Sequence, residues 1–347
     1  MKEKIAVLGA GSWGATLADH LARNGHDVVL WEISPAAAAR LERERRLPTL
    51  DGLVLHPDVR VTEDMAKALT GRPVLVNAVP SKHVRATFRA VRVSNALAPS
   101  AWAVSVSKGI ENDTLKRMTR VMEEETPALA GRTAVLAGPS HAEEVARSVP
   151  TAVVAAGPEA LREHLTRLFN SESLRVYTNP DFVGVELCGA LKNVYAVGCG
   201  VCDGLGLGDN TKAALMTRGL NEMVRVGVAE GAQVLTFLGL AGLGDLIVTC
   251  TSRHSRNRLL GEKLGQGKSA EQALGEMTMV AEGYFTTKSA KQLMDHHKLD
   301  LPIITELYAM LYEGKPARAA MRDLLSRPPV AEMMHVAPFI RQTEEKI

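Results

Sequence analysis

The sequence predicts an α/β Rossmann-like N-terminal domain followed by an all-α C-terminal domain. Up to about residue 180, short apolar runs alternate with helical stretches, and a glycine motif follows the first run. After Asn179-Pro180, long stretches with helical periodicity take over. The length of 347 residues exceeds the roughly 100–200 residues usual for one domain. We therefore expect a dinucleotide-binding domain over residues 1–180 and a helical substrate domain over 181–347.

Seven apolar runs in the first part are predicted to be strands of a parallel sheet: residues 5–8, 28–31, 74–79, 102–106, 134–137, 151–156 and 174–177. In an open α/β sheet, ligands bind where the strands end at their carboxyl sides. Five runs continue into polar or glycine-bearing turns, which should meet at that edge: residues 9–14, 31–32, 79–81, 107–109 and 138–140.

The second part is predicted to be helical over residues 183–202, 210–230, 253–264, 281–295 and 303–312, with glycine-rich turns at 203–209 and 239–245. Ser269 and Gln272 have the spacing of a capping box, and Pro302 is predicted to open a helix. Residues 183–202 are apolar, but Glu186, Lys192 and Asn193 favour a buried helix over a membrane span.

Composition excludes several classes of protein. Hydrophobic residues make up 46% of the chain and the net charge is only +2, which argues against disorder. Aromatic residues are 4% and the basic residues are dispersed, so no nucleic-acid partner is expected. The N-terminal apolar run is too short for a signal peptide, and four cysteines in apolar surroundings indicate a reducing compartment, hence the cytoplasm.

No metal site is expected. Cys199 and Cys202 form a C-x-x-C pair, but no second ligand pair has suitable spacing, and the pair lies in an apolar helical stretch. No His, Asp and Glu residues cluster at ligand spacing either.

Gly9, Gly11 and Gly14 form a G-x-G-x-x-G motif between the first predicted strand and a helical run, as dinucleotide binding requires. Glu32 follows the second strand, where an acidic residue accepts hydrogen bonds from the adenosine ribose. Its carboxylate would repel a 2′-phosphate and no basic residue adjoins it, so NAD is favoured over NADP. The alternatives are a glycine turn without a ligand and a solvated Glu32.

Eight ordered motifs resemble those of one enzyme family over nearly the whole chain. They are the Gly9 motif, Ser107-Lys108-Gly109, Ala137-Gly138-Pro139-Ser140, Gly189-Ala190-Leu191-Lys192-Asn193, residues 203–210, Gly242-Leu243-Gly244-Asp245-Leu246, Ser255-Arg256-Asn257-Arg258 and Glu282-Gly283. The chain thus resembles the NAD(P)-dependent glycerol-3-phosphate dehydrogenases of the bacterial type. The resemblance implies interconversion of dihydroxyacetone phosphate and sn-glycerol 3-phosphate for phospholipid synthesis, and a homodimer.

The resemblance also implies roles for individual residues. Lys192 matches the proton donor and acceptor. Residues that match substrate contacts are Lys108, Gly138, Ser140, Asp245, Ser255, Arg256 and Asn257, to which we add Asn193 beside Lys192. Residues that match dinucleotide contacts are Ser12, Trp13, Lys108, Ala142, Arg256, Val280 and Glu282. Glu32 and Ile33 depart from the basic residues that members carry there, which puts the family's usual NADPH preference in doubt.

Physical reasoning on Lys192 supports this assignment. A helix that is apolar nearly all round is buried, so the ammonium would be desolvated and its pKa lowered. Glu186, six residues away, lies about 120° round the helix and cannot pair with it. Asp245, on a flexible approach after a glycine turn, is the candidate partner; the alternative is a helix-capping aspartate. Lys192, Asp245 and Lys108 are the predicted catalytic residues.

Arg256 and Asn257 lie in a basic run that is either a solvated helix face or the start of a helix that binds a phosphate. Two other functions remain open at this point. One is a related two-domain dehydrogenase that acts on a hydroxy acid, which would need a carboxylate clamp. The other is an NAD-binding sensor without turnover.

Overall fold

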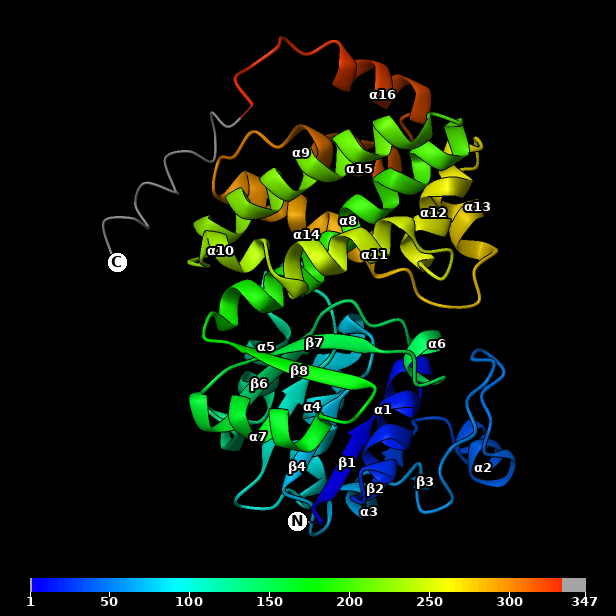
Figure 1. The fold of residues 1–347 in the computed structure, drawn as a ribbon, viewed down its shortest axis with the longest axis vertical. Coiled ribbons are helices and arrows are strands. Elements are labelled where there is room, and N and C mark those ends of the chain that lie inside the picture. Colours follow the sequence, from blue (N-terminus) through cyan, green and yellow to red (C-terminus); the bar gives the residue numbers. More distant parts are fainter. Residues whose placement is uncertain (1, 333–347) are drawn as a thin grey trace. The chain divides into compact units, whose positions relative to one another are not determined.

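The computed structural model describes residues 2–332, so residues 333–347 of the expected helical domain lie outside the described part. The chain divides into two units. The N-terminal unit comprises residues up to Lys108 and Lys116–Phe182, and the C-terminal unit comprises Gly109–Leu115 and the chain from Val183 onward. Figure 1 shows their helices and strands, with labels on most of them.

The N-terminal unit contains a sheet whose strand order is β3-β2-β1-β4-β5-β6-β7-β8. The strands of this sheet are β1 (Lys4–Leu8), β2 (Asp27–Trp31), β3 (Arg60–Thr62), β4 (Val74–Asn77), β5 (Trp102–Ser105), β6 (Thr133–Ala137), β7 (Thr151–Ala156) and β8 (Leu174–Asn179). Strands β1 to β6 all run parallel to one another, so the expected Rossmann-like fold is confirmed and their carboxyl ends share one edge.

Two features of the sheet differ from the expectation. Strand β7 pairs antiparallel with β6, and β8 then runs parallel to β7, so the sheet is not parallel throughout. Apolar runs do not encode strand direction, which depends on the length and path of the connection. Strand β3 was not predicted because it has only three residues, none of them fully buried.

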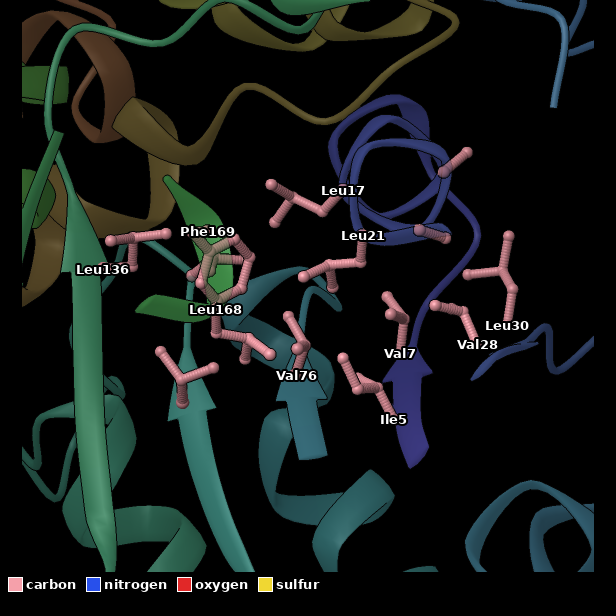
Figure 2. Close-up of a cluster of buried hydrophobic side chains, with 14 of the residues drawn as sticks. Ile5, Val7, Leu17, Leu21, Val28, Leu30, Val76, Leu136, Leu168 and Phe169 are labelled. Carbon is pink, nitrogen blue, oxygen red and sulfur yellow. The ribbon is translucent and has the colours of Figure 1, made fainter. Parts of the chain in front are cut away.

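Helices cover both faces of this sheet. They are α1 (Ser12–Arg23), α2 (Pro35–Glu44), α3 (Met65–Leu69), α4 (Val84–Ser94), α5 (Met118–Glu125), α6 (Ala142–Val145) and α7 (Glu159–Phe169), with short 3-10 turns at Ser81–His83 and Pro127–Leu129. Alternation along β1 divides the core: Ile5 and Val7 pack with α1 and α7, whereas Ala6 and Leu8 pack with α3, α4 and α5. Figure 2 shows Leu17 and Leu21 of α1 pointing toward the strands.

The C-terminal unit is helical, as expected. Its helices are α8 (Phe182–Leu205), α9 (Gly208–Ala229), α10 (Val234–Phe237), α11 (Asp245–Thr251), α12 (Arg256–Gly265), α13 (Ala270–Gly275), α14 (Glu282–His296), α15 (Pro302–Tyr312) and α16 (Ala317–Leu325). The capping box at Ser269 and Gln272 and the helix that opens at Pro302 are both present.

Helix α8 is the core of this unit, and its residues 184–202 are all buried. Glycines let it approach α12 closely: a Cβ at Gly200 would lie 1.9 Å from the Arg258 carbonyl oxygen, and one at Gly261 would lie 1.8 Å from that of Val197. By length and composition alone, Phe182–Leu205 and Val234–Thr251 could each cross a membrane. Buried core helices pass the same test, so this is weak evidence for a membrane span.

A buried carboxylate holds the start of α15. Glu222 of α9 accepts the backbone N–H groups of Ile303 (2.8 Å) and Ile304 (3.1 Å), and the Tyr195 hydroxyl donates to it at 3.3 Å. These bonds satisfy N–H groups that a helix leaves free in its first turn. Burial outweighs them and raises the pKa of Glu222 to about 7.

This raised pKa predicts a pH-dependent stability. Between pH 4.5, its ordinary pKa, and about 7, Glu222 keeps a proton in the folded protein that the unfolded chain releases. The contribution of Glu222 to the free energy of unfolding is therefore complete below the unfolded pKa and is lost as the pH rises through about 7. The loss amounts to about 3 kcal/mol. We expect the difference in unfolding free energy between wild type and Glu222→Gln to fall by that amount, measured by urea unfolding across this range. A difference independent of pH would contradict it.

Candidate active site

The glycine motif after β1 has the geometry of a phosphate-binding turn. Gly9 has a φ of 105°, and a Cβ at Gly14 would lie 1.9 Å from the Gly9 carbonyl oxygen, so both positions require glycine. At Gly11, by contrast, a Cβ would meet nothing within 4 Å. Gly11 caps α1 without a side-chain hydrogen bond, so the backbone N–H groups at the start of α1 face an open approach. This arrangement fits a dinucleotide pyrophosphate.

Ser12 and Trp13 form the first turn of α1, where Ser12 is buried and Trp13 is half-buried. Glu32 follows β2 at the same edge of the sheet as this turn. Its Oε1 accepts the backbone N–H of Ser34 at 3.0 Å, and Ile33 beside it is 74% exposed. The predicted ribose-binding carboxylate is therefore held at the end of β2 by a local hydrogen bond.

Lys108, Gly138 and Ser140 come together at the ends of β5 and β6. The Lys108 Nζ donates to the Gly138 carbonyl oxygen at 3.0 Å, and the Ser140 hydroxyl donates to the same oxygen at 3.2 Å. Gly138 has a φ of 143°, and a Cβ there would lie 2.9 Å from the Val153 Cα. Ala142, another predicted dinucleotide contact, begins α6 two residues after Ser140.

Lys192 lies at the centre of a buried polar cluster in the C-terminal unit. It is 5% exposed, which confirms the burial expected for its helix. Its Nζ donates to Asp245 Oδ1 at 2.5 Å and to the Thr249 hydroxyl at 2.6 Å, so α11 supplies both oxygens. Thr249 in turn donates to the Asp245 backbone carbonyl oxygen at 2.6 Å. Asp245 is 1% exposed and Thr249 is 3% exposed, so the charge pair is desolvated.

The approach to Asp245, for which the glycines suggested flexibility, has regular helical structure. Residues Leu240–Gly244 form a π-helical turn that runs directly into α11. Gly242 packs closely there, since a Cβ would lie 2.2 Å from the Phe237 carbonyl oxygen. Asp245 is the first residue of α11, and its side chain binds Lys192. A closely packed π-helical turn therefore presents this carboxylate.

A second cluster adjoins Lys192 through Asn193. Asn257 donates from Nδ2 to Asn193 Oδ1 at 2.8 Å and accepts the Gly283 backbone N–H on its Oδ1 at 2.8 Å. Both asparagine side chains are thereby fixed and buried. Gly283 is the second residue of α14, so Glu282 and the nearby Val280 lie at the start of that helix.

The N-terminus of α12 has the chemistry of an anion site. Ser255 caps the helix by accepting the Arg258 N–H at 3.2 Å, which makes Arg256 and Asn257 the first two helical residues. A helix N-terminus and a guanidinium both attract a phosphate dianion. Arg258, by contrast, interacts with other residues of the protein: it pairs with Asp203 at 2.5 Å and donates to the Ser252 carbonyl oxygen at 3.1 Å.

The predicted residues thus form two groups. The N-terminal unit holds the glycine turn, Glu32 and the Lys108 group, and the C-terminal unit holds Lys192, Asp245 and the α12 and α14 termini. Sequence reasoning missed Thr249. The available signal was its position four residues after Asp245, which places both side chains on one face of a helix.

The cysteines are buried thiols. All four are free, and burial raises the pKa of Cys202 to about 12. A hydrogen bond with Cys250 and burial raise the pKa of Cys199 far above its ordinary value. Such thiols are poor nucleophiles and poor metal ligands. Within residues 2–332, no group of three or more His, Cys, Asp or Glu residues could hold a metal ion.

Comparisons with known proteins point to one family. The model for the N-terminus of NAD-dependent glycerol-3-phosphate dehydrogenase matches residues 4–161, and that for its C-terminus matches residues 181–322. The chain is 50% identical over 341 residues to glycerol-3-phosphate dehydrogenase (NAD(P)+) of Pelotomaculum thermopropionicum, covering 97% of both chains. It is also 50% identical to the Geobacter metallireducens enzyme of that name, over 96% of this chain and 99% of the other.

A solved structure agrees with this. The crystal structure of glycerol-3-phosphate dehydrogenase from Coxiella burnetii superimposes with a TM-score of 0.89 at 34% identity. The match covers 94% of this chain and 99% of that one.

Proposed function

The chain belongs to the NAD-dependent glycerol-3-phosphate dehydrogenase family, and from this premise we propose that it interconverts dihydroxyacetone phosphate and sn-glycerol 3-phosphate. The observation that carries the proposal is the buried Lys192–Asp245–Thr249 cluster. Bound NAD(P) supplies the hydride that reduces the ketone carbon. The protein must then supply a proton to the ketone oxygen, and a buried ammonium is suited to both donating it and stabilising the alkoxide.

Each part of the cluster has a distinct task. Lys192 is the proton donor, the Asp245 carboxylate pairs with the ammonium and orients it, and Thr249 fixes the direction of the Nζ. In the reverse direction, the same amine accepts the hydroxyl proton of glycerol 3-phosphate. Lys108 adds positive charge toward the substrate, with Gly138 and Ser140 beside it.

The phosphate is assigned to the start of α12. Ser255, Arg256 and Asn257 supply the helix N-terminus and guanidinium, and Asn193 holds Asn257 in place. The dinucleotide is assigned to the glycine turn with Ser12, Trp13, Glu32 and Ala142, and to Lys108, Arg256, Val280 and Glu282. We propose that the product serves glycerophospholipid synthesis, and that the enzyme is a cytoplasmic homodimer. The four free, buried cysteines support a reducing compartment.

Oxidation of NADH and NADPH by dihydroxyacetone phosphate tests the function. Turnover with this triose phosphate excludes both an NAD-binding sensor and a dehydrogenase confined to hydroxy acids. No oxidation of either dinucleotide would overturn the proposal. Light scattering of the purified protein tests the dimer.

Glu32 predicts a preference for NADH over NADPH. A 2′-phosphate beside this carboxylate would be repelled, and Trp31 to Ser34 contain no basic side chain. We expect Glu32→Ala to lower the ratio of kcat/KM for NADH to that for NADPH about tenfold, equivalent to about 1.4 kcal/mol. Glu44→Ala, which removes an exposed carboxylate paired with Arg43, is the matched control. An equal change in both variants would show that net charge, and not Glu32, sets the preference.

A further inference from the structure

A short segment between β5 and α5 belongs to the C-terminal unit. Residues Gly109–Leu115 follow Lys108 directly in sequence, yet they pack with the helical unit, whereas the chain on both sides packs with the N-terminal unit. We call Gly109–Leu115 the strap. Its first residue, Gly109, is joined by a peptide bond to Lys108. The proposed function places Lys108 at the substrate and the dinucleotide.

Two side chains of α14, Ser289 and Gln292, form hydrogen bonds with the strap. The Ser289 hydroxyl donates to the Ile110 carbonyl oxygen at 2.9 Å and lies 2.5 Å from Asn112 Oδ1. Gln292 bonds Asp113 twice, accepting its backbone N–H at 3.1 Å and donating to its Oδ1 at 3.0 Å. Ser289 is fully buried, so water could not replace these hydrogen bonds if the strap moved away. Separation of the strap from α14 would therefore cost free energy.

A cation strengthens the same attachment. The Lys288 ammonium lies 3.1 Å from Asp113 Oδ1. Hydrogen bonds from Gln292 and Lys288 lower the pKa of Asp113, so its carboxylate stays charged. Lys288, Ser289 and Gln292 lie within about one turn of α14 and all reach the strap.

The strap backbone is strained. Asp113 has a φ of 69° and Leu115 a φ of 58°, both in the left-handed region that residues with a Cβ seldom occupy. Such backbone persists only where surrounding contacts determine it. The bonds to α14 are those contacts for Asp113.

The same helix is joined to the active-site cluster at its other end. The Gly283 N–H in the first turn of α14 donates to Asn257, which holds Asn193 next to Lys192. Helix α14 therefore carries two attachments within the C-terminal unit, one to the Asn257–Asn193 pair beside Lys192 and one to the strap.

We infer that Ser289 and Gln292 are positioning residues that act on catalysis through Lys108, by fixing the strap to which Lys108 is bonded. This inference rests on the proposed function of Lys108. Neither side chain needs to touch substrate, because their effect passes along the backbone from Ile110 and Asp113. Misplacement of a catalytic group by about 1 Å is sufficient to cost a large factor in rate.

A double-mutant cycle tests this inference. Ser289→Ala and Gln292→Ala are each expected to lower kcat/KM for dihydroxyacetone phosphate about tenfold in the wild-type background. In the Lys108→Ala background, each should change it less than about twofold, since the residue through which they act is gone. If Ser289→Ala folds poorly, Gln292→Ala still tests the inference, because Gln292 is only half-buried.

Lys291→Ala is the matched control, because Lys291 neighbours Gln292 on α14 but pairs with Asp295 of its own helix. It should leave kcat/KM unchanged. Equal losses with and without Lys108 would overturn the inference, as would full activity of both variants. If the wild-type protein had no turnover, the proposed function itself would be contradicted. That result is distinct from failure of the positioning role alone, in which the wild type is active.

Discussion

Replacement of Lys192 by alanine is expected to lower kcat for reduction of dihydroxyacetone phosphate by about 1,000-fold or more, while NADH binding stays near normal. In the proposed mechanism, this variant removes the group that protonates the ketone oxygen and stabilises the developing alkoxide, and these two contributions together are worth several powers of ten. The glycine turn and Glu32 lie in the N-terminal unit and are untouched by the change. NADH absorbance gives kcat, and NADH fluorescence gives binding.

The same change has a structural cost that must be separated from catalysis. Alanine leaves the Asp245 carboxylate buried without its ammonium, a loss of about 3–5 kcal/mol for a broken buried pair. Lys192→Ala combined with Asp245→Asn removes the uncompensated charge and should be better folded yet equally inactive. Lys268→Ala, which removes a lysine paired with Glu276 on the surface, is the control and should keep wild-type kcat. Turnover within tenfold of wild type in the Lys192 variant would remove Lys192 from its role.

Arg256→Ala is expected to raise KM for dihydroxyacetone phosphate about 100-fold, equivalent to about 2–3 kcal/mol. Arg256 stands at the first position of α12, where we propose that guanidinium and helix N-terminus act on the same anion. Loss of the guanidinium weakens binding of the phosphate more than it affects the chemistry at the ketone. Steady-state kinetics over a range of triose phosphate concentrations measure the effect.

Two comparisons make the phosphate assignment specific. Arg253→Ala removes an exposed arginine three residues earlier, before the helix starts, and should leave KM unchanged. Dihydroxyacetone, which lacks the phosphate, should be reduced equally poorly by wild type and by Arg256→Ala. An unchanged KM for the phosphorylated substrate in Arg256→Ala would refute the assignment.

Local features of this fold were predictable from sequence. The order strand, G-x-G-x-x-G, helix fixes the β1–α1 unit within a few residues, and Gly9 and Gly14 each have a local steric reason to be glycine. Burial of α8 followed from its apolar composition, and burial of Lys192 followed from that of α8. Ser269 and Gln272 formed the capping box that their spacing indicates.

Features that depend on tertiary packing were not predictable. The antiparallel pairing of β7 with β6 could not be predicted, because an apolar run has the same composition in either strand direction. Glycines 242 and 244 suggested flexibility, but their turn is π-helical and Gly242 packs closely against Phe237. The strap looks like an ordinary loop in sequence, because its attachment to Ser289 and Gln292 joins residues about 180 positions apart.

Rescue of the Lys192→Ala variant by small amines tests most directly whether Lys192 acts as the proton donor. Methylammonium can enter the space left by the side chain and donate a proton, whereas tetramethylammonium brings the same charge without one. We expect turnover to rise with methylammonium concentration and to stay flat with tetramethylammonium. Equal turnover with the two cations, or wild-type turnover with neither, would contradict the mechanism.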